Sequence, residues 1–186
     1  RRRLLGERAD RNAPPGRGLC FRGAGIYDHY GPAVAELVAQ RNELLTAYTP
    51  YQPAMSQGTL QAIFEYQTAI CELTGMEVSN ASGYDGATVA ADACFVAKHA
   101  TGRPKIVVTE ATNPQVRQVI KTYAPGFGLE IVEVPHEGGV TDPDRVREAA
   151  VDAAAVIFQH PNFFGNLENA PDLAAAANEA GAMPIA

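Results

Sequence analysis

The sequence is poor in cysteine, and its three cysteines follow none of the patterns that disulfides or metal sites require. Cys20, Cys71 and Cys94 lie far apart, are odd in number and form no C-x-x-C pair. A disulfide framework needs an even set, and a structural zinc site needs closely spaced ligands. The cysteines therefore indicate a reducing compartment. Cys71 and Cys94 occupy apolar helical patterns, which favours buried small hydrophobic residues over reactive thiols.

Long apolar runs are missing as well. No segment approaches the roughly 20 apolar residues of a membrane-spanning helix, and the first residues lack the apolar core of a secretory signal. The Arg-rich start has the charge of an organellar transit segment, but it contains acids and no serine. We expect a cytoplasmic chain with no membrane association. The missing initial Met and the abrupt end at MPIA favour a chain that is cut at both ends.

Basic charge is scarce beyond the N-terminus. Seven of the 15 basic residues and two of the 21 acidic residues fall in the first 22 positions, so the remainder holds 8 basic and 19 acidic residues. Nucleic acid is bound by clustered Lys and Arg along its phosphate backbone. Such an acidic body is a poor match, and we expect no nucleic acid partner.

The common catalytic signatures are also absent. Neither the phosphate-binding pattern G-x-x-x-x-G-K-[ST] nor the zinc pattern H-E-x-x-H occurs, and no serine lies in G-x-S-x-G. The glycines of residues 23–31 miss the dinucleotide pattern G-x-G-x-x-G. The four histidines have no metal-ligand spacing, so no metal site is expected.

Hydrophobic periodicity divides the chain near residue 100. Residues 1–20 contain Pro-Pro-Gly and indicate a flexible or truncated arm. Residues 21–100 form a helical segment, and residues 101–186 alternate strands with helices as an incomplete part of the same large domain. Helices are predicted at 32–46, 57–74 with Ser56 as N-cap, 87–100, 114–123, 143–150 and 171–180, and strands at 105–109, 129–134, 154–159 and from 183 onward.

The alternation of strand and helix is typical of an α/β fold with a mostly parallel sheet and flanking helices. Ligands of such sheets collect where the strands end. The segments 110–113, 135–139 and 160–165, which follow three predicted strands, are therefore the expected ligand loops.

The loop at residues 80–86 (NASGYDG) precedes the Ala-rich helix at 87–100. Bare backbone N–H groups and the positive end of a helix can bind an anion. A plain turn with capping residues is the alternative interpretation.

Polar aromatic residues concentrate in turns. A tyrosine in a Pro-bounded turn has little conformational entropy to lose, and it can present its hydroxyl to a carboxylate or its ring to a cofactor. Packing at the base of a loop is the alternative for each one, but three clusters together favour a site. They are Tyr27, His29 and Tyr30 in IYDHYGP, Tyr48 and Tyr51 in YTPYQP, and Tyr84 in GYDG.

Three long segments carry a resemblance to a known family. They are GAGIYDHYGPAV, TAYTPYQPAMSQGTLQAIFEYQTAICELTGMEVSNASGYDGATVAADA and QHPNFFGNLE. In order and spacing they are similar to the P-protein of the glycine cleavage system, glycine dehydrogenase (decarboxylating), and in particular to its first-subunit type. The match covers roughly residues 20–186. It implies the aspartate-aminotransferase-like large-domain architecture of pyridoxal-phosphate enzymes, truncated at the C-terminus, in agreement with the alternation above.

The resemblance also implies an activity. The family decarboxylates glycine with pyridoxal phosphate, releases CO2 and passes the aminomethyl group to the lipoyl arm of the H-protein, whose disulfide is reduced. The chain would thus be part of an oxidoreductase that acts on the CH–NH2 group of glycine.

The resemblance requires a lysine for the internal aldimine and an acid beside the pyridine nitrogen, both at or beyond the strand that starts at residue 183. The sequence has only Lys98, Lys105 and Lys121, at helix ends or at a strand start. In the two-subunit form of the enzyme, subunit 2 carries the lysine that subunit 1 lacks. The chain is therefore expected to complete a composite site with glycine dehydrogenase subunit 2 and to be inactive alone.

No catalytic residue is assigned to this chain. The resemblance implies substrate-facing residues Tyr48, Thr49, Tyr51 and Gln57, and cofactor-neighbouring residues Asn80, Ser82, Tyr84, Asp85, His160 and Asn162. The alternatives are a fragment of the single-chain P-protein, a fragment of another pyridoxal-phosphate enzyme, or a non-catalytic α/β interaction module.

Overall fold

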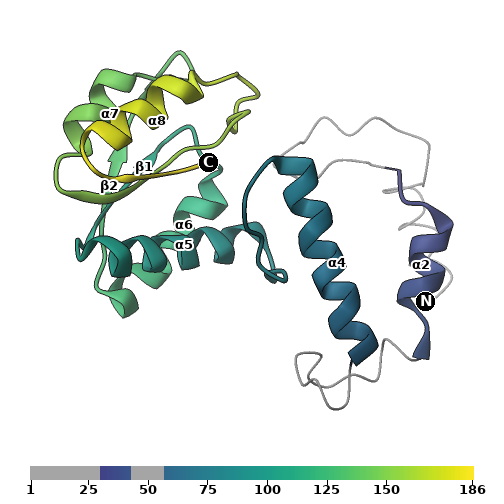
Figure 1. Cartoon of the computed structure of the whole chain (residues 1–186). Helices are drawn as coiled ribbons and strands as arrows, with labels where there is room; N and C mark the ends of the chain where they lie inside the picture. Colours follow the sequence, from purple (N-terminus) through teal and green to yellow (C-terminus); the bar gives the residue numbers. More distant parts are fainter. Residues whose placement is uncertain (1–29, 43–56) are drawn as a thin grey trace, which may run out of the picture.

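The computed structural model describes residues 30–42 and 57–186 of the chain. Residues 86–186 form an α/β body, which is preceded by helices α2 (Ala33–Ala39) and α4 (Gln57–Thr74) (Figure 1). No helix in these two ranges is long and apolar enough to cross a membrane.

The centre of the body is a parallel sheet. Within the described residues it has four strands in the order β2-β1-β5-β6. The strands are β1 (Lys105–Thr109), β2 (Glu130–Val134), β5 (Ala153–Ile157) and β6 (Met183–Ile185). Val107 of β1 pairs with Val132 of β2 on one side and with Val156 of β5 on the other. The predicted α/β class with a mostly parallel sheet is confirmed.

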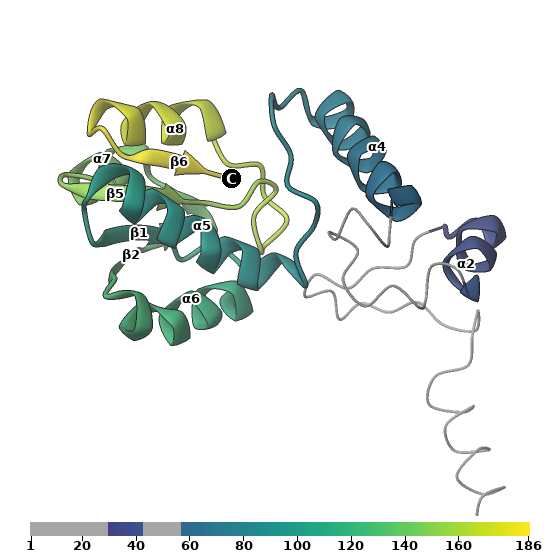
Figure 2. The same cartoon turned by 60° about the horizontal axis from the view of Figure 1, so that its bottom comes forward.

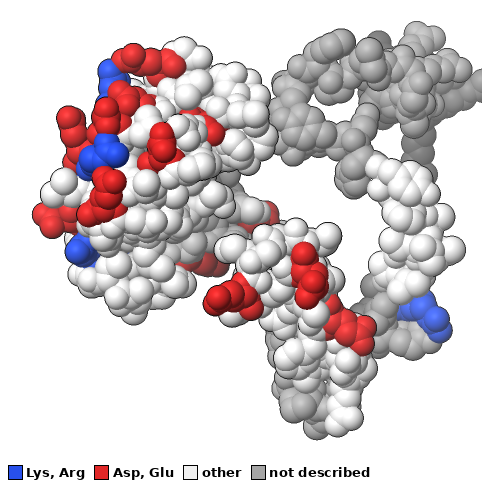
Figure 3. All heavy atoms as spheres, turned by 45° about the horizontal axis from the view of Figure 1, so that its top comes forward, with Lys and Arg blue, Asp and Glu red and all other residues white. Residues whose placement is uncertain are grey.

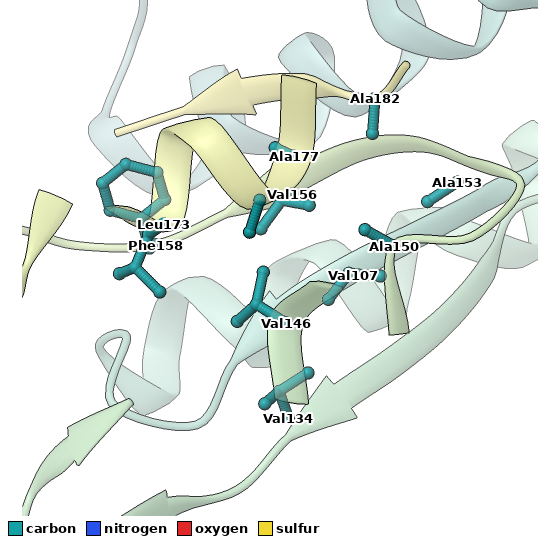
Figure 4. Close-up of a cluster of buried hydrophobic side chains, with 11 residues drawn as sticks. Val107, Val134, Val146, Ala150, Ala153, Val156, Phe158, Leu173, Ala177 and Ala182 are labelled. Atoms are coloured by element: carbon teal, nitrogen blue, oxygen red, sulfur yellow. The ribbon is translucent and has the colours of Figure 1, made fainter. Parts of the chain in front are cut away.

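Helices cover both faces of this sheet. Helices α5 (Gly86–Thr101) and α6 (Pro114–Phe127) cover one face, and α7 (Pro143–Ala149) and α8 (Ala170–Glu179) cover the other. Side chains of β1 alternate between them, because successive residues of a strand point to opposite faces. Ile106 and Val108 pack toward α5 and α6. Val107 packs with Val146 of α7 and Leu173 of α8 (Figure 4), and each such buried side chain stabilises the fold by about 1.5–3 kcal/mol.

Capping residues set the helix boundaries. Asp85, Asn113 and Asp142 cap α5, α6 and α7, since each side chain accepts a hydrogen bond from a backbone N–H two or three residues later. Gly102 and Gly128 end α5 and α6 in the left-handed conformation, with φ of 72° and 60°. Such a conformation favours glycine at a helix end.

One predicted helix is interrupted, and one predicted helix end is wrong. Within 32–46, helix α2 ends at Ala39, where the N–H of Arg41 bonds to the carbonyl of Val38 at 3.1 Å, and Asn42 is helical again. Residues 43–46 lie outside the described ranges. Helix α6 runs to Phe127 rather than 123, because Pro125 sits in its last turn, where a missing N–H removes a single helical hydrogen bond.

A short antiparallel hairpin occupies the predicted loop after β2. It consists of β3 (His136–Glu137) and β4 (Val140–Thr141). Gly138 and Gly139 form its turn with φ of 59° and 82°, the pair of positive angles that a tight two-residue hairpin requires.

Helix α4 begins and ends as predicted, since it starts at Gln57 and stops before Gly75 (φ 71°). The N-cap predicted at Ser56 lies outside the described residues. No residue of α4 is buried, and Figures 1 and 2 show this helix apart from the α/β body. Helix α5 behaves differently, because its Cys94 is fully buried against the sheet. The sequence division near residue 100 thus falls at the end of a helix that packs with the later half.

Candidate functional site

The carboxyl edge of the sheet, where its parallel strands end, holds the loops that can form a site. Strands β1 and β5 are neighbours, yet the chain leaves β1 toward α6 on one face and leaves β5 toward α8 on the other. Connections that part in this way open a crevice between the carboxyl ends of the two strands, where ligands of open α/β sheets bind. The topology therefore points to the segments 110–113 and 158–168.

Hydrogen bonds join these two segments. The N–H of Asn113 donates to Gln159 Oε1 at 2.9 Å, and the N–H of Phe163 donates to the carbonyl of Ala111 at 2.9 Å. Asn113 also caps α6, so the same residue fixes the helix start and the edge of the crevice. The two segments are thus joined by one backbone–backbone bond and by one bond from a backbone N–H to a side chain.

The β3–β4 hairpin is bonded to the segment that follows β5. The side-chain amides of Asn162 and Asn166 both donate to the carbonyl of Gly139, at 2.7 and 3.0 Å. A Cβ at Gly139 would lie 2.7 Å from Asn166 Nδ2 and the backbone there has a φ of 82°, so a larger residue would displace Asn166 and strain the turn. These contacts bring the segments 110–113, 135–139 and 160–165 together, and their role as ligand loops stays a prediction.

A buried carboxylate lies beneath these loops. Glu168 is 4% exposed. Its Oε2 accepts from the N–H of Thr141 at 3.0 Å, and its Oε1 accepts from the Thr141 hydroxyl at 3.1 Å and from Asn162 Nδ2 at 2.8 Å. No hydrogen bond from a Lys or Arg reaches it among the residues that the structure describes. These hydrogen bonds therefore stabilise the buried Glu168 carboxylate in place of a counter-ion.

The two predicted site residues of this loop have different surroundings. Asn162 is 4% exposed, and its Oδ1 accepts from the N–H groups of Phe164 and Asn166 at 3.0 and 3.1 Å. Because its Nδ2 is also engaged, the whole amide is used within the protein. His160 is exposed directly after Gln159. The geometry gives Asn162 a shaping role, while His160 remains accessible to a ligand.

Asp85 closes the N-terminus of α5, toward which the NASGYDG loop leads. Helix α5 runs antiparallel to β1, so this terminus lies at the carboxyl edge. The Asp85 carboxylate accepts from the N–H of Thr88 at 2.9 Å and puts negative charge where an anion would bind. At this position the structure therefore agrees with the alternative interpretation, in which Asp85 is a capping residue of α5. Asn80, Ser82 and Tyr84 are exposed.

A cleft of about 410 Å³ lies between α4 and the same loop. None of the residues that line it is charged. They are Thr59, Ala62, Ile63, Tyr66, Ala81 and Ser82. Gln67 Nε2 donates to the carbonyl of Ser79 at 2.6 Å and ties the loop to the helix. Gln57 is exposed at the start of α4. Tyr48, Thr49 and Tyr51 lie outside the described residues.

All three lysines of the chain are engaged away from the crevice. Lys98 Nζ donates to two carbonyls at the end of α6, at 2.5 and 3.2 Å. Lys105 Nζ donates to a carbonyl just after α7 at 2.8 Å. Lys121 Nζ donates to Glu133 Oε2 at 2.6 Å. None is placed to bond a ligand at the carboxyl ends of β1 and β5.

Burial and pairing shift pKa values away from the crevice. Partial burial would raise the pKa of Glu133, but hydrogen bonds and charges from Lys121 and Arg117 outweigh it and hold the pKa below its ordinary value. Burial raises the pKa of Cys94 to about 11 and is only partly offset by a backbone hydrogen bond. Cys94 is thus an unreactive buried thiol, as predicted, whereas Cys71 is half-buried.

The described residues of the crevice do not fit pyridoxal phosphate as a self-sufficient site. No lysine amine reaches the crevice, and Arg117 is engaged with Glu133 and with the carbonyl of Thr112. The α5 terminus carries Asp85 instead of an open set of donors. A phosphate would therefore meet helix ends without a cation.

Sequence reasoning missed Gln159, Glu168 and Thr141. Gln159 had a weak signal, because it is the first polar residue after an apolar strand. Glu168 and Thr141 had none, since their contact spans 27 residues of chain.

Comparisons with known proteins agree with one another. A family model described as "Glycine cleavage system P-protein" matches residues 6–186. A curated protein of Geotalea uraniireducens, named probable glycine dehydrogenase (decarboxylating) subunit 1, is 53% identical over 167 residues, which are 89% of this chain and 38% of that protein. A Bacillus subtilis protein of the same name is 48% identical over 184 residues, which are 98% of this chain and 41% of that protein. The chain thus spans about two fifths of these relatives.

Solved structures give the same picture. A crystal structure of glycine decarboxylase (P-protein) in inhibitor-bound form superposes with a TM-score of 0.86 at 42% identity, over 98% of this chain and 40% of that chain. A Burkholderia pseudomallei sphingosine-1-phosphate lyase superposes with a TM-score of 0.63 at 19% identity, over 98% of this chain and 44% of that one. The second likeness shows the fold alone.

Proposed function

The chain belongs to the glycine cleavage system P-protein family, and from this membership we propose that it acts in a first-subunit type of glycine decarboxylase. The whole enzyme would decarboxylate glycine, release CO2 and pass the aminomethyl group to the lipoyl arm of the H-protein. Pyridoxal phosphate supplies, when bound, the electron sink that lets CO2 leave. Relatives named as subunit 1 support a subunit 2 partner.

One observation supports the proposal that the cofactor lysine lies on subunit 2. The amines of Lys98, Lys105 and Lys121 are all hydrogen-bonded within the body and lie away from the crevice. A cofactor lysine on subunit 2 accounts for this arrangement, because this chain then contributes surfaces and hydrogen bonds to a shared site. We therefore place the cofactor lysine on the partner and a composite site between the subunits.

The residues of this chain would orient the substrate in that site. Tyr48, Thr49 and Tyr51, with Gln57 at the start of α4, are the proposed substrate-facing group. A tyrosine hydroxyl can hold the glycine carboxylate through a hydrogen bond that is released as CO2 departs, which is orientation and not proton transfer. Ordering substrate and cofactor in this way lowers the entropic cost of the reaction.

The cofactor-neighbouring group has two parts at the carboxyl edge. Asn80, Ser82, Tyr84 and Asp85 approach through the loop before α5, and His160 and Asn162 through the loop after β5. His160 is exposed and can contact a ring or phosphate presented by the partner. Asn162 would act by holding its own loop, since its amide has no hydrogen-bonding capacity left.

The alternatives differ in where the lysine lies. In a single-chain P-protein, or in another pyridoxal-phosphate enzyme, the lysine would follow the present segment on the same chain. A non-catalytic α/β interaction module would have no lysine partner at all. The names of the relatives favour the two-subunit form over both.

Tyrosine variants of the full-length subunit, assembled with its partner, test the proposal. Tyr48→Phe and Tyr51→Phe should lower the rate of glycine exchange with CO2 about tenfold, because one hydrogen bond to a charged group is lost. Cofactor absorbance should be nearly unchanged, since these tyrosines are proposed to touch substrate only. Normal exchange kinetics in both variants would remove them from the site. Cofactor binding by the subunit alone would overturn the composite arrangement.

A further inference from the structure

A buried hydrogen-bond cluster joins the hairpin to the loop after β5. It is here called the Glu168 cluster and consists of Glu168, Asn162, Asn166, Thr141 and Gly139. Its five members come from two segments more than 20 residues apart in sequence. Because the cluster bonds the hairpin to the loop after β5, a change in it would act on both segments.

The cluster needs a carboxylate at position 168. Glu168 lies two residues before α8, and it accepts from the N–H of Thr141, which lies two residues before α7. Its two partners supply three donor groups, which are the Thr141 N–H, the Thr141 hydroxyl and Asn162 Nδ2. An amide of the same shape would turn its own NH2 toward one of these donors in either orientation. Glutamine therefore fits the space and breaks one bond.

The cluster also sets the path of the loop. Asn162 receives the N–H groups of Phe164 and Asn166, while the neighbouring N–H of Phe163 bonds to Ala111 after β1. Loss of the bond from Asn162 to Glu168 would free the turn that follows His160. From this geometry we infer that Glu168 is a positioning residue that acts through Asn162 to hold His160 at the crevice. The inference rests on the proposed function.

Two variants of equal size break the link from its two sides. Glu168→Gln removes one acceptor, and Asn162→Asp replaces a donor with an oxygen that faces Glu168 and the carbonyl of Gly139. If both act on one link, their effects are not additive in the double variant. Glu148→Gln is the matched control, since Glu148 is exposed on α7. If Glu168→Gln does not fold, Asn162→Asp carries the test, because it leaves the carboxylate bonded to Thr141.

Amide hydrogen exchange measures the cluster independently of activity. In the full-length subunit with its partner, the N–H groups of Thr141, Phe164 and Asn166 should exchange roughly tenfold faster in either variant. The N–H groups of Val107 and Val156, in the core strands, should keep their protection, which shows that the fold is intact. Unchanged exchange at the loop positions would overturn the inference.

Kinetic measurements then distinguish a positioning role of Glu168 from a role in stability alone. At a temperature where these core amides are protected, kcat for glycine exchange with CO2 should fall about tenfold in both variants, because a misplaced group costs rate without unfolding the protein. The control Glu148→Gln should match the wild type. Faster loop exchange with unchanged kcat and KM would overturn the positioning role. An inactive wild-type assembly would contradict the proposed function instead, and would leave the exchange result on the cluster readable.

Discussion

The two edges of the sheet differ in most of their side-chain hydrogen bonds, although Arg117 donates to the carbonyl of Thr112 at the carboxyl edge. At the amino edge, cationic side chains bond to carbonyls at helix ends and at the start of β5. Arg103 Nη1 donates to the carbonyls of Ala153, Ala180 and Gly181 at 3.1, 3.3 and 3.1 Å, and Lys98 does the same at the end of α6. At the carboxyl edge, side-chain amides and carboxylates such as Glu168 bond to N–H groups and to one another.

This difference follows from the direction of helices in an α/β fold. Carbonyls point toward the amino edge and favour cations, while N–H groups point toward the carboxyl edge and favour acceptors. On the face of the body that Figure 3 shows, Asp and Glu side chains cover more of the surface than Lys and Arg side chains. The amines of Lys98, Lys105 and Lys121 are bonded within the body.

The largest effect is expected from Arg103→Met at the amino edge. Methionine keeps much of the apolar stem but removes three hydrogen bonds from a charged donor, so the free energy of unfolding should fall by about 2 kcal/mol. Urea unfolding of the subunit gives this number. Arg147→Met, which changes an exposed arginine on α7, is the control and should have a much smaller effect.

Because Arg103 lies at the amino edge, Arg103→Met is not expected to change the catalytic rate. Glycine exchange with CO2 should keep its kcat at temperatures where the variant is folded. A lower kcat in a folded Arg103→Met enzyme would show that the amino edge is not purely structural.

A smaller effect is expected at the carboxyl edge from Asp85. Asp85→Ala removes the cap of α5 and should lower the free energy of unfolding by about 1 kcal/mol. Asp85→Asn keeps an oxygen for the N–H of Thr88 and should stay close to the wild type. Equal losses in thermal unfolding of the two variants would mean that the charge, and not the cap, is what matters there.

The smallest effect concerns Glu133, whose partners Lys121 and Arg117 lie on α6. Because its pKa is lowered in the folded protein, its charge contributes stability above the ordinary carboxylate pKa, and this contribution is lost as pH falls through the lowered value. Glu133→Gln should therefore cost below about 1 kcal/mol near pH 7 after solvent screening. Unfolding curves of wild type and variant should converge in acid, and a pH-independent gap would contradict the ion-pair account.

Much of the fold followed from local sequence. Strand β1 was predicted at its observed bounds, because an apolar run between Pro104 and a polar segment leaves little choice. The hairpin was missed, since two-residue strands carry no periodicity. Helix α6 continues beyond its predicted end, because Pro125 in the last turn removes only one helical hydrogen bond.

The site was less predictable than the fold. The choice of the three loops as candidate ligand loops follows from topology, and the structure bonds these loops to one another. The Glu168 cluster was not, because its bonds join residues 141 and 168 and no local pattern encodes them. The interpretation of Asn162 as a cofactor neighbour stays a prediction, and its burial adds the loop-holding role. The roles of Tyr48 and Tyr51 also stay predictions, since these residues lie outside the described ranges.

The most direct test locates the lysine that binds pyridoxal phosphate. Borohydride reduction of the assembled enzyme fixes the cofactor covalently to that lysine, and peptide mass spectrometry then identifies it. We expect the label on subunit 2, with peptides containing Lys98, Lys105 and Lys121 unmodified, because their amines are bonded within the body. A label on any lysine of subunit 1 would contradict the composite site.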